Sequence, residues 1–207
     1  MMLFNIETST FIPEYMLQNE QGNQNWIEVE DEEINGISES ITGGGAVWVE
    51  GGKVKYSGKA PSEYHIFDLK SKTFKVSEDK KTEFFKSKKQ SLLSTLSDKA
   101  DKIKDGLLVG YPQTEIESFY RQEKEALAWQ ADKNTDAPML KQIARIRNIP
   151  FDVLVQKVLE KSGQFALAIG MIIGQRQAFE DRLLATKTLE ELTALEKEIE
   201  EWKFQVN

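Results

Sequence analysis

The sequence of 207 residues contains no cysteine and only one histidine, His65. Without cysteine there is no disulfide scaffold, no thiolate nucleophile and no thiolate metal site. One histidine leaves neither a cluster of imidazole ligands nor a second imidazole for acid–base chemistry. We therefore predict no catalytic residues, no metal site, no cofactor and no enzymatic activity.

Long apolar runs are also missing. The most apolar segment, Phe165–Gly174, has ten residues without charge, about half of the roughly 20 residues that a membrane span needs. The N-terminus has neither the basic flank nor the apolar core of a secretory signal. The sequence thus predicts no membrane partner and synthesis in the cytoplasm.

Positive charge is absent from residues 1–50, although the net charge of the whole chain is only −7. The acids of this segment are Glu7, Glu14, Glu20, Glu28, Glu30, Asp31, Glu32, Glu33, Glu39 and Glu50. Two interpretations remain: an acidic surface that attracts a basic partner, or a solvated acidic face. The lysines crowd between Lys70 and Lys104 but are interleaved with acids, so we expect no nucleic acid partner.

Residues 1–76 have the alternation and turn signals of β-structure. The clearest hairpin pairs residues 46–50 with residues 53–56 around Gly51-Gly52, whose positive φ angles suit a primed turn. The other predicted elements are a strand at 2–6, a strand at 26–30, one helical turn at 31–34, a tight backbone approach or flexible link at 43–45, and a hairpin of residues 64–68 with 73–76.

After Val76 the hydrophobic period changes from two to about 3.6, which predicts helices only. Ser77 is expected to cap a helix that continues to about Leu108. Its apolar residues step by three and four, in the order Leu93, Leu96, Ala100, Ile103 and Leu107. This short heptad seam either packs within its own chain or forms the arm of a homo-oligomer.

Further helices are predicted at 113–131, 139–147, 152–185 and 189–204, with Asp152 and Thr188 as caps of the last two. The fold class is therefore α+β, with a small N-terminal β-rich domain followed by an all-helical C-terminal region. The expected division is a β-rich domain at 1–76, a connecting helix at 77–109 and a helical domain at 110–207.

The segment Gly163–Gly174 is expected to be the centre of that helical domain. A helix so poor in polar side chains needs other helices around most of its surface. Gly170 and Gly174 lie four residues apart, so they share one face and would admit a neighbouring backbone. A bulky side chain at Gly170 is then expected to overpack the domain.

Aromatic residues gather in the β-rich part, where aliphatic residues are few. Exposed tryptophan and tyrosine anchor many protein interfaces, whereas some aromatic rings must fill the small core. The candidate partner-binding residues are Trp26, Trp48, Tyr56, Tyr64 and Phe67.

Three segments in order resemble phage tail fibre assembly proteins. They are LFNIETSTFIPEYM, the acidic strand and helical turn NWIEVEDEEINGI, and the hairpin with its proline link and aromatic–aspartate strand, GGAVWVEGGKVKYSGKAPSEYHIFD. Phe74 stands where the family often has tryptophan. The resemblance covers about residues 1–100, and residues 110–185 are similar to C-terminal segments common on phage tail proteins.

The resemblance implies a chaperone that binds the C-terminal, receptor-binding tip of a tail fibre and assists its folding or trimerisation. The family has no catalytic residues to carry over. Such a protein works in the host cytoplasm; the alternative is a structural tail or fibre-tip component retained in the virion tail.

Overall fold

The computed structural model describes residues 1–19 and 25–204, so Glu20 of the acidic segment lies outside it. The chain forms two compact units, Met1–Lys88 and Lys89–Asn207. Helix α2 (Glu78–Leu107) begins in the first unit and ends in the second. The predicted division at residues 76 and 109 stays a prediction that proteolysis can test.

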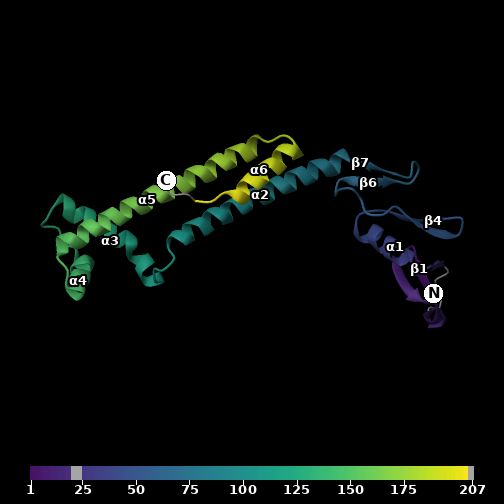
Figure 1. Cartoon of the computed structure of the whole chain (residues 1–207), viewed down its shortest axis with the longest axis horizontal. Helices are drawn as coiled ribbons and strands as arrows, with labels where there is room; N and C mark the ends of the chain where they lie inside the picture. Colours follow the sequence, from purple (N-terminus) through teal and green to yellow (C-terminus); the bar gives the residue numbers. More distant parts are fainter. Residues whose placement is uncertain (20–24, 205–207) are drawn as a thin grey trace. The chain divides into compact units, whose positions relative to one another are not determined.

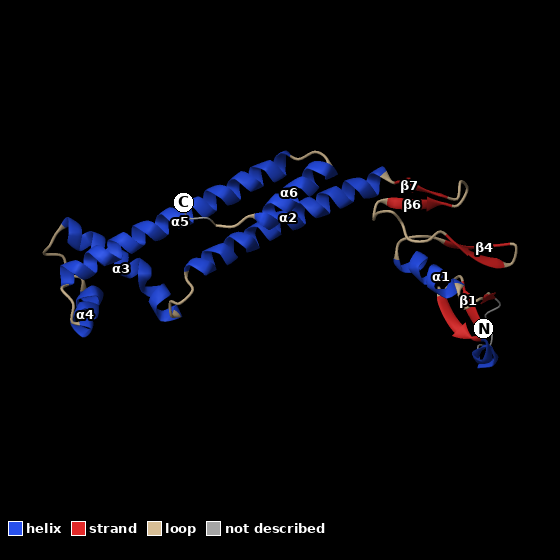
Figure 2. Ribbon diagram, in the orientation of Figure 1, coloured by secondary structure: helices blue, strands red, loops and turns tan. Residues whose placement is uncertain are grey.

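The first unit holds small antiparallel sheets and one α-helix (Figure 2). Its elements are β1 (Met2–Asn5), β2 (Thr10–Pro13), the 3₁₀ helix η1 (Glu14–Asn19), β3 (Trp26–Val29), α1 (Glu33–Thr42), β4 (Val47–Glu50), β5 (Lys53–Tyr56), β6 (His65–Asp68) and β7 (Thr73–Val76). The described strands form one sheet in the order β2-β1-β3 and two hairpins, β4-β5 and β6-β7.

Both predicted hairpins are confirmed. Gly51 and Gly52 have φ angles of 61° and 75°, as a primed turn requires. The core of the unit is small and consists of Phe4, Val29, Ile37 and Val54. It joins the three-stranded sheet to α1 and β5.

Helix α1 is ten residues long, so the prediction of a single turn was too short. Its sequence hides the helix, because glycine, serine and threonine are weak helix formers. Ser40 is fully buried and its hydroxyl donates to Gly36 O at 2.8 Å and accepts from Gly58 N at 2.9 Å. Tertiary contacts therefore stabilise α1 where local propensity does not.

Beyond Val76 every described element is a helix, which confirms the α+β class (Figure 2). The helices after α2 are α3 (Gln113–Ala131), α4 (Pro138–Arg147), α5 (Phe151–Ala185) and α6 (Leu189–Glu201). Figure 1 shows α3 and α4 against the first part of α5, and α6 beside its last part. The first contact contains the main core of the unit, made of Ala126, Ala137, Leu140, Ala144, Leu154 and Val155.

The second contact joins α2, α5 and α6. Leu96 and Ala100 of the predicted seam are buried, but the buried leucine one turn earlier is Leu92 rather than Leu93. The ammonium group of Lys89 donates to the main-chain oxygen of Leu184 at 2.8 Å. On α6, the predicted apolar side is confirmed, since Leu192, Leu195, Ile199 and Trp202 are all buried.

The three predicted caps have different outcomes. Before α2, Ser77 accepts a hydrogen bond from the backbone N–H of Lys80 at 3.4 Å, as expected. Thr188 accepts a hydrogen bond from the backbone of Glu191 and completes a capping box, as expected. Asp152 does not cap α5: the N-cap residue is Pro150, and no side chain closes this end. Proline at that position fixes the backbone without needing a capping oxygen.

The expectation of a buried centre at Gly163–Gly174 is wrong for the single chain. Within the described residues, a Cβ added at Gly163, Gly170 or Gly174 would have no neighbour within 4 Å outside the helix backbone. Leu167 is 69% exposed and Ile173 is 47% exposed. One side of the segment is covered, since Ile172 is 3% exposed, but the main core of the unit lies at the start of α5, where α3 and α4 pack.

Candidate functional site

The two hairpins of the first unit meet through aromatic side chains. Trp48, on β4, stacks on Phe67 of β6 with ring centroids 5.3 Å apart and planes 24° apart. Phe67 in turn contacts the ring of Phe74 across its own hairpin, at 5.1 Å. We call Trp48, Phe67 and Phe74 the aromatic cluster; all three rings are only partly buried.

Register explains why these rings face each other. On β4, Trp48 points away from the face that carries Val47 and Val49, and opposite it on β5 is Lys55. That other face includes Val54 across the hairpin, which is buried in the core of the unit. The outer face of β4-β5 therefore presents Trp48 to the second hairpin.

A second contact fixes the hairpins to each other. Lys72, in the β6-β7 turn, donates to both carboxylate oxygens of Glu50 at 2.6 and 2.7 Å. The indole N–H of Trp48 reaches the same carboxylate at 3.4 Å. The hydrogen bond from Lys72 and then that from Trp48 hold the pKa of Glu50 below its usual value. This carboxylate thus couples the aromatic cluster to the turn.

The other three candidate aromatics lie elsewhere in the unit. The ring of Tyr56 lies over Gly36, where a Cβ would come within 2.4 Å of it, so Tyr56 holds α1 against β5. Tyr64 contacts His65 and the ring of Phe84 on α2, at 5.3 and 5.6 Å. Trp26 is partly buried on β3, and its indole N–H is buried without a described acceptor. Of the five candidates, only Trp48 and Phe67 come together.

Sequence reasoning passed over several exposed apolar side chains near the hairpins. Their exposed fractions are 41% for Val49, 43% for Ile66, 53% for Leu69 and 44% for Val76. The sequence contains a signal for this exposure, because strand alternation puts Ile66 on the face opposite to Phe67. A two-stranded hairpin can bury only one of its faces against a neighbour, so the other face stays open.

The outer edges of the β6-β7 hairpin are also open. Among the described strands, β6 and β7 pair only with each other. Unpaired N–H and C=O groups at such an edge are able to bind another extended chain. Lys75 and Asp68 form an ion pair on this hairpin, and the hydrogen bond from Lys75 lowers the pKa of Asp68 to about 2.

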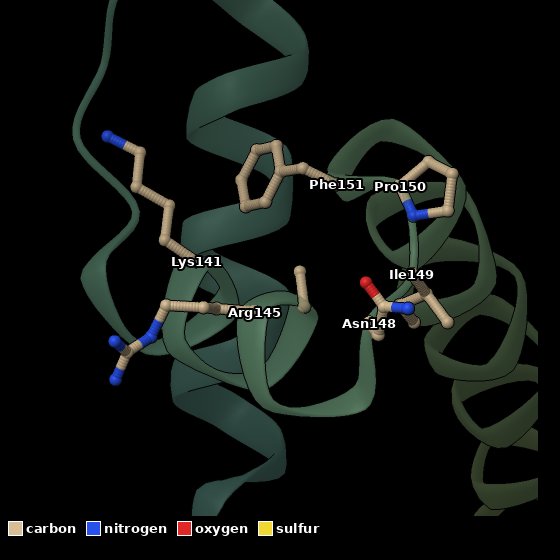
Figure 3. A pocket seen from close by; sticks show the side chains of 7 residues that line it. Lys141, Arg145, Asn148, Ile149, Pro150 and Phe151 are labelled. Carbon is tan, nitrogen blue, oxygen red and sulfur yellow. The ribbon is translucent and has the colours of Figure 1, made fainter.

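In the helical unit, a hollow of about 730 Å³ lies between α4 and the start of α5. Figure 3 shows Lys141 and Arg145 extending from α4 near the ring of Phe151, with Asn148 and Pro150 at the connection. These cations were not singled out from the sequence, although α4 carries no acid. Lys141 is paired with Asp136 at 2.7 Å, and the guanidinium of Arg145 donates to the side-chain oxygen of Gln142 at 3.0 Å.

Two further classes of site are absent from the part of the chain that the structure describes. No group of three or more histidine, aspartate or glutamate side chains is placed to hold a metal ion among residues 1–19 and 25–204. Over the same residues, none of the helices combines the length and the apolar character needed to cross a bilayer.

Comparisons with known proteins find a family model and a relative. Residues 160–202 match the family model of the HI1402 helical domain. A protein of Haemophilus influenzae, itself described as uncharacterized, is 70% identical over 66 residues, which are 32% of this chain and 97% of the relative. No solved structure matches the chain significantly. Because it spans nearly the whole of that relative at this identity, the chain belongs to the same family as the Haemophilus influenzae protein.

Proposed function

We propose that the protein is an assembly chaperone for a phage tail fibre, and that its β-rich unit binds the C-terminal part of the fibre. The observation that carries the proposal is the ordered resemblance of residues 1–100 to tail fibre assembly proteins. The geometry of the hairpins adds a physical way in which such binding would work.

The aromatic cluster supplies the anchor. Trp48 and Phe67 are stacked and partly exposed, so a partner would desolvate rings that the fold already holds in place. Rigid aromatic side chains lose little conformational entropy on binding and dominate many interfaces. Val49, 41% exposed, and Ile66, 43% exposed, lie on the opposite faces of these hairpins and are not part of the aromatic cluster.

The open edges of the β6-β7 hairpin would fix the orientation of a bound fibre segment. A fibre segment that is not yet folded exposes strands in search of partners, and an edge strand can pair with one of them temporarily. This pairing would keep the segment from aggregating until two further fibre chains arrive. The acidic residues of the N-terminal segment would speed the encounter with a basic partner.

The test is co-expression of the C-terminal region of the fibre with the full-length protein, with Trp48→Ala, with Phe67→Ala, or alone. The matched control is Tyr120→Ala, which removes an aromatic ring that is 76% exposed on α3. Circular dichroism establishes that each variant is folded. We expect soluble trimeric fibre with the parent and with Tyr120→Ala, and aggregated fibre in the other three cases.

Two results contradict the proposal. A fibre that trimerises equally well alone has no need of a chaperone. A protein that co-purifies with mature particles in fixed stoichiometry is a structural tail component, which is the alternative function.

A further inference from the structure

We propose that the exposed central face of α5 binds the same face of a second copy, in an antiparallel helix pair. This inference goes beyond the proposed function and rests on different residues. We call this surface the α5 face; it contains Gln156, Glu160, Gly163, Leu167, Gly170, Gly174, Gln177 and Asp181, all of them exposed.

The centre of the α5 face carries no charge and has no neighbour among the described residues of the single chain. Spacings of three and four residues put its members on one side of the helix. Leu167 is 69% exposed, and the neighbouring Ile173 is 47% exposed. From Ser162 to Gln175 the sequence holds no charged residue. A helix in water is not expected to keep such a surface open, so another surface should cover it.

The face has a shape that complements itself. Leu167 projects, while Gly163, Gly170 and Gly174 leave the helix flat, with open space where a Cβ would be. A two-fold axis between Ala168 and Ile169 puts Leu167 opposite Gly170 and Gly163 opposite Gly174. Each leucine then fits over a glycine of the other copy, and the backbones can come close. An isologous interface requires this kind of self-complementarity.

The positions of the acids on the α5 face favour an antiparallel pair over a parallel one. In this register Glu160 lies opposite Gln177, and Gln156 lies opposite Asp181, so no acids face each other. A parallel pair in register would put each of the two acids opposite its own copy, which is unfavourable.

The length of the face is consistent with a modest affinity. From Gln156 to Asp181 the helix is about 38 Å long at 1.5 Å per residue. One helix pair of this length buries an area at the small end of specific interfaces, about 1,200 Å² in total. We therefore expect a dimer that dissociates on dilution.

Sedimentation equilibrium of the full-length protein tests the proposal over a wide range of concentration. The parent should sediment as a monomer–dimer equilibrium. Gly170→Glu should raise the dimer dissociation constant at least about tenfold, because it inserts a carboxylate opposite Leu167. The substitution should leave the monomer folded, since a Cβ at Gly170 has no neighbour among the described residues. Ile146→Glu is the matched control on α4, where Ile146 is 76% exposed.

Disulfide trapping tests the register. The sequence has no native cysteine, so only the introduced cysteines can form a disulfide. The double variant Gly163→Cys/Gly174→Cys should form a covalent dimer under oxidation, whereas Gly163→Cys alone should not. Efficient trapping of the single variant would mean a parallel pair and would overturn the arrangement.

Three further results would overturn the proposal itself. One is a parent that stays monomeric at every concentration. Another is a dimer with the same dissociation constant in Gly170→Glu. The third is a protein that stays monomeric by itself but binds the fibre region through the α5 face. This result would assign the face to the fibre. The first two results do not bear on whether the aromatic cluster binds the fibre, so the two proposals can fail separately.

Discussion

The first turns of α5 and its centre differ in how deeply their apolar side chains are buried, although they belong to one helix. Leu154 and Val155 are 3% and 0% exposed, in a segment that also carries Lys157 and Glu160. The centre has no charge at all, yet Leu167 is 69% exposed. Burial therefore follows the position of the neighbouring helices and not the apolarity of the segment.

The connections explain which part of α5 gains neighbours. Asn148 ends α4 in the left-handed conformation, with φ of 51° and ψ of 48°, and α5 begins only three residues later. So short a link brings α4 back along the first turns of α5. Among the described residues no helix covers Leu167, which is 69% exposed.

The largest expected effect on stability comes from comparing a buried leucine of α5 with an exposed one. Leu154→Ala should lower the free energy of unfolding by about 2–5 kcal/mol, because it leaves a cavity between α3, α4 and α5. Leu167→Ala, the matched control on the same helix, should change it by less than about 0.5 kcal/mol at concentrations where the protein is monomeric. Urea unfolding of both variants measures the difference, and equal losses would refute the comparison.

A second pair of variants compares two glycines. Gly45→Ala should destabilise the first unit by about 1–3 kcal/mol, since its Cβ would lie 2.0 Å from the main-chain oxygen of Gly58. This agrees with the tight backbone approach anticipated at residues 43–45.

Gly170→Ala should instead stabilise the monomer by up to about 1 kcal/mol, because alanine is the better helix former. Thermal unfolding at low concentration measures both. A loss of stability at Gly170 would restore the close packing that the sequence suggested and the structure contradicts.

A smaller effect on stability is expected at the N-terminus of α6, where the capping box lies. Thr188→Ala should cost about 1 kcal/mol, because it removes the capping box of α6. Thr193→Ala is the control on the same helix; there the hydroxyl only bonds back to Leu189 O. Chemical denaturation should separate the two variants, and an equal response would mean that the box contributes nothing.

The smallest effect concerns pH and the β6-β7 hairpin. The pKa of Asp68 is lowered to about 2 by the hydrogen bond from Lys75, so the ionised form is favoured in the folded state. The stabilisation is complete above the unfolded pKa near 3.8 and is lost as pH falls through about 2. The carboxylate is exposed to solvent, so the effect on unfolding should be slight.

An NMR titration of Asp68 should show its pKa returning toward the ordinary value in Lys75→Gln. Lys72→Gln is the control, because Lys72 pairs with Glu50 instead. An unchanged pKa in Lys75→Gln would mean that the ion pair is absent in solution.

The sequence predicted the elements whose signals are local. Gly51-Gly52 specified a primed turn, and Thr188 with Glu191 specified a capping box. The period change at Ser77 separated strands from helices. Each of these signals depends on the conformation of a few adjacent residues, so neighbours in space hardly alter it.

Features that depend on distant partners were not predictable in this way. Helix α1 continues to Thr42 because Ser40 and Gly36 meet Gly58 and Tyr56, which are far along the chain. The pairing of Trp48 with Phe67 depends on how two hairpins face each other. The exposure of Gly170 depends on which side of α5 faces the other helices, since Ile172, two residues further on, is 3% exposed.

We assign fibre binding to the aromatic cluster and self-association to the α5 face, and one titration tests this separation most directly. The C-terminal region of the fibre is titrated calorimetrically into the parent, Trp48→Ala and Gly170→Glu. We predict that Trp48→Ala weakens binding by at least about 30-fold, as expected for an interface anchor, while Gly170→Glu binds like the parent. Parent-like binding by Trp48→Ala, together with a loss in Gly170→Glu, would contradict the account and move the fibre site to the helical unit.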